Sequence, residues 1–192
     1  MQKYFKLILI LLIPIIVYLS SFGILVYDSD YYTTLTAEYS SVDASQMNKD
    51  MVEYFKTGLV PSSFSEFNEK ERVHLKDVRD VIQSLLWVLM ASVVLFVFLL
   101  RFAKDRQKII FYGGIITVVL PILFFLPFDL LFTQMHNLFF KPGSWVFASN
   151  ALLVILYTQN FFFEFAKSII LSGFCLGLVI TILSSKLYSL LQ

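Results

Sequence analysis

The chain has 192 residues, of which 58% are hydrophobic and only 15% are charged, and its formal net charge is +1 at pH 7. An average soluble domain has roughly 45–50% apolar and about 25% charged residues, so this composition excludes an ordinary soluble domain and predicts an all-α membrane protein. The length leaves room for one integral membrane domain, 1–192, and for no second catalytic domain, and the small net charge indicates no nucleic-acid partner.

The first apolar run covers residues 7–27 and follows a short basic head that contains Lys3 and Lys6. A cleaved signal peptide normally has a hydrophobic core of about 7–15 residues that ends in a small-residue cleavage site. This run is longer and has no such site. We therefore predict an uncleaved membrane-spanning helix.

Residues 28–80 contain many Ser, Thr, Tyr, Asp and Glu and are predicted to form an extracellular cap, with a short helix over 46–56. Later in the cap, Asn68 is followed three residues on by Glu71, which resembles a capping box that opens a helix. We expect this helix to continue into the second span.

The second predicted span covers 81–102 and is followed by a short loop with many cations. Short loops rich in Lys and Arg stay in the cytoplasm. The amino terminus then lies inside and the cap lies outside. The cations of the loop are Arg101, Lys104, Arg106 and Lys108.

The third predicted span covers 109–126, and the last covers 168–187. Only two residues separate the apolar stretch 146–165 from the last run, which is too short for a turn between antiparallel spans. We therefore expect 127–167 to be an extracellular interfacial segment, with 145–165 interfacial or re-entrant. The prediction is four transmembrane helices with both termini in the cytoplasm.

The only two histidines, His74 and His136, fall on the predicted outer face. Asp77 follows His74 by three residues on the same helix face, and Asp129 precedes His136 by seven residues, about two helical turns. A carboxylate that orients an imidazole makes histidine a suitable general base near neutral pH. The alternative is a pair of interfacial histidines without a role.

Metal binding is the rival use of these four side chains, since three such ligands with an open position form a catalytic zinc site. Neither histidine belongs to an H-E-x-x-H motif, so we predict no metal. Cys175, the only cysteine, lies in apolar surroundings that would keep its thiol protonated and inert.

An aromatic group between the last two spans is typical of an interfacial belt and would also suit a groove for acyl chains. Its members are Phe139, Phe140, Trp145, Tyr157, Phe161, Phe162 and Phe163.

Three pieces of sequence occur together and in order on the predicted outer face: ERVHLKDV at 71–78, FDLLFTQMHNLFF at 128–140, and Trp145. Their motifs H-x-x-D-V and F-D-x-x-F-x-x-x-H resemble the small four-span bacterial family of lipoprotein intramolecular transacylases, Lit. The resemblance extends from the first span through the last. The chain departs from it at 158–162, TQNFF, where the family tends to have Pro-Glu before a Phe-Phe pair.

The resemblance implies a bacterial cell-membrane enzyme that acts on diacylated lipoproteins among membrane lipids. It moves the sn-2 acyl chain of the diacylglyceryl-cysteine onto the α-amino group of that cysteine, giving the lyso form. The donor is an ester and the product an amide, so no cofactor is expected.

Within this hypothesis His74, oriented by Asp77, is the general base, and His136, with Asp129 behind it, is the acid or oxyanion donor. The two histidine roles are exchangeable. The side chains expected to hold the substrate are Arg72, Asn137, Trp145 and Phe161.

Two other classes of function are alternatives. One is a non-enzymatic accessory protein or small transporter component, although transport predicts charges inside the spans, and the middles of 81–102 and 109–126 have none. The other is a metal-dependent membrane hydrolase.

Overall fold

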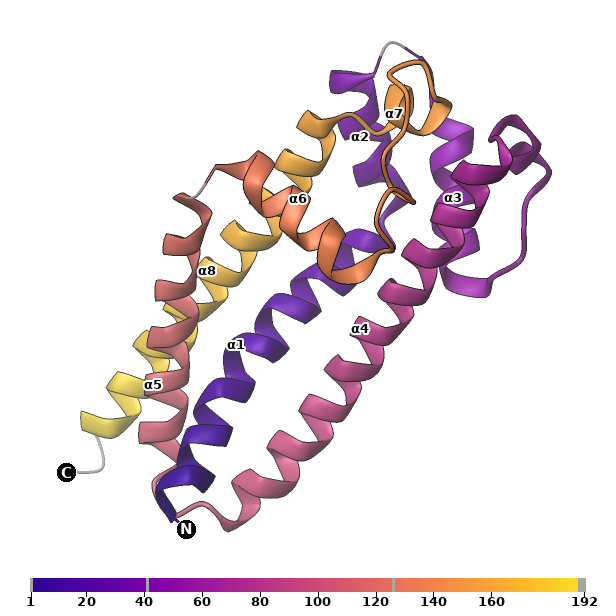
Figure 1. Ribbon diagram of the computed structural model, residues 1–192. Helices are drawn as coiled ribbons and strands as arrows, with labels where there is room; N and C mark the ends of the chain where they lie inside the picture. The colour runs from indigo at the N-terminus through magenta and orange to yellow at the C-terminus, as the bar shows by residue number, and fades with distance from the viewer. Residues whose placement is uncertain (1, 41, 126, 190–192) are drawn as a thin grey trace. The chain divides into compact units, whose positions relative to one another are not determined.

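The computed structural model describes residues 2–40, 42–125 and 127–189, and within them the chain is helical, with no strand (Figure 1). This confirms the predicted all-α class. The chain divides into two compact units. Unit 1 comprises Met1–Phe22, Leu85–Phe125 and Ser168–Gln192, and unit 2 comprises Gly23–Ser84 and Leu126–Lys167.

Unit 1 is built from the apolar parts of three long helices together with a shorter helix and a 3-10 segment. These elements are α1 (Gln2–Val26), α4 (Glu69–Phe102), α5 (Arg106–Val119), η2 (Leu120–Phe125) and α8 (Gln159–Ser189).

Three helices among the described residues are long and apolar enough to cross a membrane: Tyr4–Val26, Glu69–Phe102 and Gln159–Lys186. The second is a helix of 34 residues, about 51 Å long, so it exceeds a hydrocarbon core of about 30 Å. Its charged first part, 69–80, precedes the apolar run 81–102.

The predicted third span, 109–126, corresponds to α5, which has 14 residues, and to η2, while Leu126 lies outside the described residues. The α-helix ends there because Pro121 has no N–H to donate to the carbonyl of Thr117. The hydroxyl of Tyr18 donates to that carbonyl instead, at 2.8 Å. A side chain of α1 therefore satisfies the backbone group that the proline leaves free.

The last helix begins at Gln159 and not at 168, so residues 159–165 belong to the same helix as the predicted last span. No Gly or Pro lies between 159 and 168 to interrupt the helix. The Thr158 hydroxyl accepts a hydrogen bond from the Phe161 N–H at 3.3 Å and caps this end. Residues 166 and 167, which were expected to separate two elements, lie inside this one helix.

Glycines allow close packing of the helices in unit 1. A Cβ on Gly113 would lie 2.3 Å from Ile13 Cδ1, and one on Gly173 would lie 2.2 Å from Tyr18 Cε1. Helix α1 therefore packs closely on both α5 and α8. The buried core here consists of Leu9, Ile13, Val17, Ala103 and Ile109.

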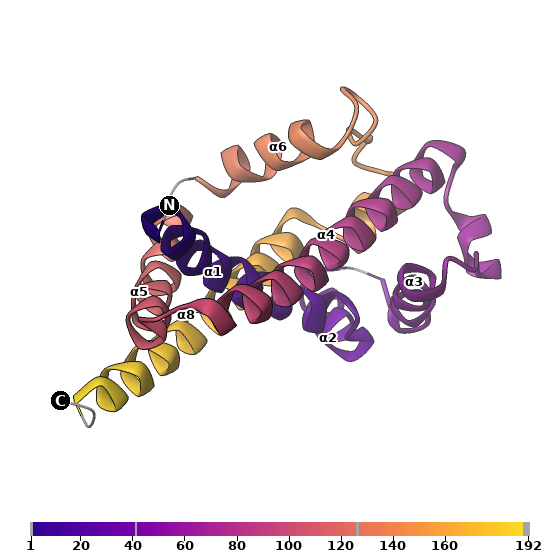
Figure 2. The same ribbon diagram turned by 90° about the horizontal axis from the view of Figure 1, so that it is seen from below.

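Unit 2 holds the short helices and the first turns of α4. Helices α2 and α3 pack against each other (Figures 1 and 2), and α3 confirms the short helix predicted over 46–56. It ends on Gly58, whose φ of 79° is left-handed. The remaining elements are α2 (Ser29–Tyr39), α3 (Ser45–Thr57), η1 (Ser62–Glu66), α6 (Phe128–Phe139) and α7 (Leu152–Leu156).

A buried amide joins three segments of unit 2. Asn48 on α3 is fully buried, and its side chain donates to the Thr36 hydroxyl of α2 at 2.8 Å. The Tyr157 hydroxyl donates to the Asn48 carbonyl oxygen at 3.0 Å. The residue that follows α7 is therefore fixed to the pair formed by α2 and α3.

The predicted capping box is confirmed at the start of α4. The Asn68 N–H donates to Glu71 Oε2 at 2.8 Å, and the Glu71 N–H donates to Asn68 Oδ1 at 3.0 Å. Glu71 is only 1% exposed, and its Oε1 also accepts the Leu153 N–H at 2.8 Å. One buried carboxylate thus begins a helix and anchors α7 to it.

Replacing Glu71 should release the segment that precedes α7. We expect Glu71→Ala to leave the Leu153 N–H buried without an acceptor, a cost of about 1–3 kcal/mol. In a Trp87→Phe background Trp145 is the single tryptophan. Its fluorescence should shift to longer wavelength and be quenched more readily by acrylamide.

Asn68→Ala is the matched control, because it breaks the capping box but keeps the bond between Glu71 and Leu153. It should destabilise α4 while changing Trp145 emission much less. Identical spectra for the Glu71→Ala variant and its parent would contradict the anchoring role.

Candidate active site

The two histidines converge in unit 2. His74 lies on the second turn of α4 and His136 near the end of α6, and they are 5% and 7% exposed. Their ring centroids are 6.2 Å apart, with an angle of 26° between the planes. Two segments far apart in the sequence therefore bring the imidazoles together.

Aromatic rings enclose the histidine pair. Phe140 contacts both imidazoles, with centroids 4.8 Å from His74 and 5.4 Å from His136. Phe147 lies 5.4 Å from His74, and on the other side Phe132 and Trp145 lie 4.1 Å and 4.7 Å from His136. The imidazoles are therefore buried in an apolar environment.

Hydrogen bonding differs between the two imidazoles. His136 Nδ1 lies 2.8 Å from the Phe132 carbonyl oxygen, which can only accept, so Nδ1 carries the proton and Nε2 keeps a lone pair. His74 Nδ1 is buried and has no hydrogen-bond partner in the part of the chain that the structure describes. One ring is fixed in its tautomer, and the other has an unpaired nitrogen.

The predicted pairing of each histidine with a carboxylate is wrong as a direct contact. Asp129 is in the first turn of α6, about 10 Å along the axis from His136, and it accepts a hydrogen bond from Gln159. Asp77 makes no hydrogen bond to His74 within the described residues, because the imidazole faces the rings of Phe140 and Phe147.

Burial keeps both histidines neutral. His74 lies in the charged part of α4 before the apolar run, and desolvation, followed by the neighbouring His136 and Lys70, lowers its pKa to about 4. Desolvation also lowers the pKa of His136, against the opposing effect of its hydrogen bond to the Phe132 carbonyl. At pH 7 the pair is uncharged.

The other expected substrate-binding residues lie in different surroundings. Arg72 lies two residues before His74 and Asn137 directly follows His136, and both side chains are exposed. Phe161 is 2% exposed and packs in a second aromatic cluster, with Tyr32 at 5.5 Å and Tyr157 at 5.1 Å. Trp145 alone among them contacts a histidine ring.

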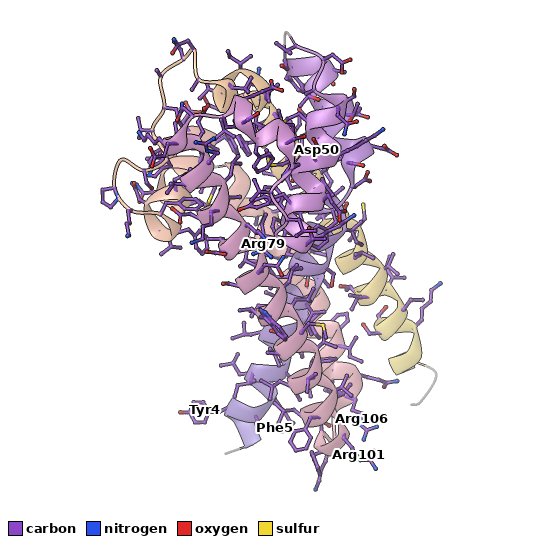
Figure 3. All side chains as sticks on the ribbon, turned by 90° about the vertical axis from the view of Figure 1, so that its right-hand side faces the viewer. Tyr4, Phe5, Asp50, Arg79, Arg101 and Arg106 are labelled. Carbon is purple, nitrogen blue, oxygen red and sulfur yellow. The ribbon has the colours of Figure 1, made fainter. Side chains whose placement is uncertain are left out.

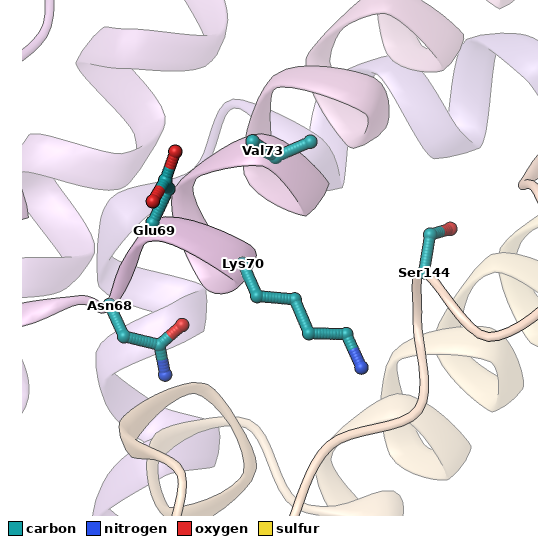
Figure 4. A pocket seen from close by; sticks show the side chains of 5 residues that line it. All are labelled: Asn68, Glu69, Lys70, Val73 and Ser144. Atoms are coloured by element: carbon teal, nitrogen blue, oxygen red, sulfur yellow. The ribbon is translucent and has the colours of Figure 1, made fainter.

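An open pocket of about 570 Å³ lies at the start of α4 (Figure 4). Val73 and Ser144, which line it, directly precede His74 and Trp145 in the sequence. The Lys70 ammonium donates to the Val146 carbonyl and lies 5.0 Å from the Phe147 ring centroid. The pocket is lined by Asn68, Glu69, Lys70, Val73 and Ser144.

From the sequence, Phe140 was expected in an interfacial belt or acyl-chain groove, and neither Phe132 nor Phe140 was placed beside a histidine. Phe132 and Phe140 lie four residues before and after His136, a helical spacing that places all three on one face and was available as a signal. Phe147 and the anchor at Glu71 depend on the path of the chain after α6, for which the sequence has no regular pattern.

No three His, Cys, Asp or Glu side chains gather closely enough to hold a metal ion among the described residues. The side chains considered as metal ligands from the sequence, His74, His136, Asp77 and Asp129, do not form such a group there.

Comparison with known proteins places these observations in a family. The family described as lipoprotein intramolecular transacylase Lit matches residues 3–162. A protein of Aquifex aeolicus (strain VF5), described as uncharacterized, is 24% identical over 132 residues, which are 67% of this chain. The match spans 61% of the length of that relative.

Solved structures show the same fold. The membrane-integral lipoprotein intramolecular transacylase Lit from Bacillus cereus is 19% identical, with a TM-score of 0.78 over 100% of this chain and 95% of its own. A variant of that protein in which one histidine is replaced by alanine is 18% identical, with a TM-score of 0.80 over 98% of this chain and 94% of its own.

The family match covers most of the chain, including both histidines, and the resemblance predicted from sequence is confirmed. The likeness to a membrane-integral protein agrees with the apolar helices, so the chain is a membrane protein. It belongs to the lipoprotein intramolecular transacylase family.

Proposed function

We propose that this chain is an intramolecular acyltransferase that converts a diacylated bacterial lipoprotein to its lyso form. The observation that carries the proposal is the pair of buried, neutral histidines whose rings stack 6.2 Å apart inside an aromatic enclosure. An apolar site with two imidazoles suits a lipid ester whose cleavage needs one proton removed and one proton supplied.

The reaction balances without a cofactor. The α-amino nitrogen of the lipidated cysteine attacks the carbonyl carbon of the sn-2 ester and forms the amide bond. The bond from that carbon to the glycerol oxygen breaks, and the amine proton goes to this oxygen, leaving a free hydroxyl. A free amine of this type has a pKa of about 8, so part of it is already unprotonated near neutral pH.

The hydrogen bonds favour one of the two exchangeable role assignments. The Phe132 carbonyl fixes His136 with its Nε2 lone pair available, so His136 is the better general base for the amine proton. His74, whose pKa is lowest, protonates poorly and readily gives up a proton once it holds one. We assign to His74 the second transfer, in which it receives the amine proton that His136 has removed and passes it to the leaving glycerol oxygen.

We further propose four spans, with both termini in the cytoplasm and the site on the extracellular face. α5 and η2 together measure about 33 Å, from 14 residues at about 1.5 Å and six at about 2.0 Å, which matches a hydrocarbon core of about 30 Å. This length supports a third span.

Charge supports the proposed orientation. An ion pair joins Lys6 to Asp105, so the head of α1 and the loop between α4 and α5 lie on one side of unit 1. Arg101 and Arg106 lie at the same end as Tyr4 and Phe5 (Figure 3). A short loop rich in cations stays in the cytoplasm, which puts the residues that follow α1 outside.

Loss of either imidazole should abolish the conversion. We expect His74→Gln and His136→Gln each to lower the rate at least 100-fold, the range of general acid and base catalysis. The variants are expressed in a bacterium that lacks the activity, and mass spectrometry of a lipoprotein's N-terminal peptide determines its acylation.

Gln46→Ala, an exposed change on α3, is the control and should convert lipoproteins at the wild-type rate. Unchanged lyso product from both histidine variants would contradict the proposal and favour the alternative of a non-enzymatic accessory protein.

The low pKa of His74 predicts its behaviour in acid. With two histidines in the chain, a ¹³C-histidine spectrum has two titrating signals, assigned with the two Gln variants. His74 should stay neutral until the pH approaches about 4. A midpoint near the ordinary value of about 6.5 would show that it is not desolvated.

Stability should follow the same pH range. The unfolded chain protonates His74 near pH 6.5 and the folded chain only near pH 4. The stability that comes from burying neutral His74 is therefore fully present above about pH 6.5 and is lost as the pH falls toward 4. Thermal unfolding in detergent should show this loss, and His74→Phe should reduce it.

A further inference from the structure

Trp145 carries a second buried polar group without a partner beside the histidine pair. Its indole Nε1 is buried and forms no hydrogen bond in the part of the chain that the structure describes. An indole nitrogen can only donate. Burying a donor unpaired costs free energy, so such groups are rare in native proteins, and a catalytic role is one reason for them.

The position of the indole relates it to the reacting groups. Its ring centroid lies 4.7 Å from that of His136, with 39° between the planes. The proton on His136 Nδ1 is already directed at the Phe132 carbonyl, so it is not available to a ligand. The indole N–H of Trp145 is free to donate a hydrogen bond to a ligand. Unlike the imidazole protons, its proton takes no part in the proposed proton transfers.

The segment that carries Trp145 is held at two points. The Lys70 ammonium donates to the carbonyl of Val146, the next residue, and Glu71 accepts the Leu153 N–H further along. Both anchors are in the first turn of α4, just before His74. A donor fixed in this way is preorganised and needs little rearrangement during a reaction.

We propose that the Trp145 N–H donates a hydrogen bond to the carbonyl oxygen of the sn-2 ester. This inference rests on the proposed acyl transfer. When the amine nitrogen bonds to the carbonyl carbon, that oxygen takes the electron pair of the C=O bond and becomes an oxyanion. When the bond to the glycerol oxygen breaks, the pair returns. In a dry site, a fixed donor stabilises this transient charge much more than it would in water.

Trp145→Phe tests the proposal with the least disturbance, because it keeps an aromatic ring beside His136 and removes only the donor and ring size. Loss of one oxyanion donor typically lowers kcat about 100- to 1000-fold, and KM for the diacylated peptide should change only a few-fold. Trp87→Phe is the matched control, since Trp87 is 74% exposed, and it should keep full activity.

A second measurement does not depend on turnover. The chain has two tryptophans, so the ¹⁵N-indole spectrum shows two signals, and Trp87→Phe identifies the signal of Trp145. A diacylglyceryl-cysteine peptide with an acetylated amine binds but has no nucleophile. Its addition should move the Trp145 N–H signal downfield, as a new hydrogen bond requires.

The outcomes separate the two hypotheses. Full kcat in Trp145→Phe, or an unmoved indole signal when dialysis shows the acetylated peptide bound, would overturn the role of Trp145 and leave the acyltransferase proposal standing. If the wild-type chain makes no lyso product, the acyl-transfer proposal fails, and the oxyanion role fails with it even where the indole signal moves.

Discussion

The buried carboxylate of Glu71 is the interaction on which the arrangement of unit 2 depends. It caps the first turn of α4 through the Asn68 N–H and holds the start of α7 through the Leu153 N–H. The first contact fixes where the helix begins and therefore the direction of the His74 side chain one turn later. The second fixes the chain that covers this side chain. A Glu71 side chain at 1% exposure is stable there because both of its carboxyl oxygens accept backbone hydrogen bonds at a helix amino terminus.

The aromatic enclosure turns two ordinary histidines into a paired site. Phenyl and indole rings around His74 and His136 remove water and supply no charge, so each imidazole stays neutral. Two cations at this separation would repel one another, and His136 is itself one cause of the low pKa of His74. The same enclosure therefore brings the rings together and allows at most one of them to hold an extra proton at a time.

The features that could be predicted from the sequence are those that depend on residues close together in the chain. The capping box joins residues three apart, and hydropathy marks long apolar helices, so the capping box and three of the four predicted apolar helices are found in the described residues. The bond from Glu71 to Leu153 joins residues 82 apart and uses a backbone N–H, which every residue except proline has, so no pattern marks it. The carboxylate for His136 was misjudged because seven residues share a helix face but not a contact distance.

The neutrality of the enclosure bears on which form of an amine can enter it. Ring faces and an imidazole lone pair replace only part of the water around an ammonium ion, so the cation loses hydration free energy on entry. An uncharged amine loses far less. Binding of the nucleophile is therefore linked to its deprotonation. The aromatic side chains favour the uncharged amine, which is the reactive form, before it contacts a catalytic group.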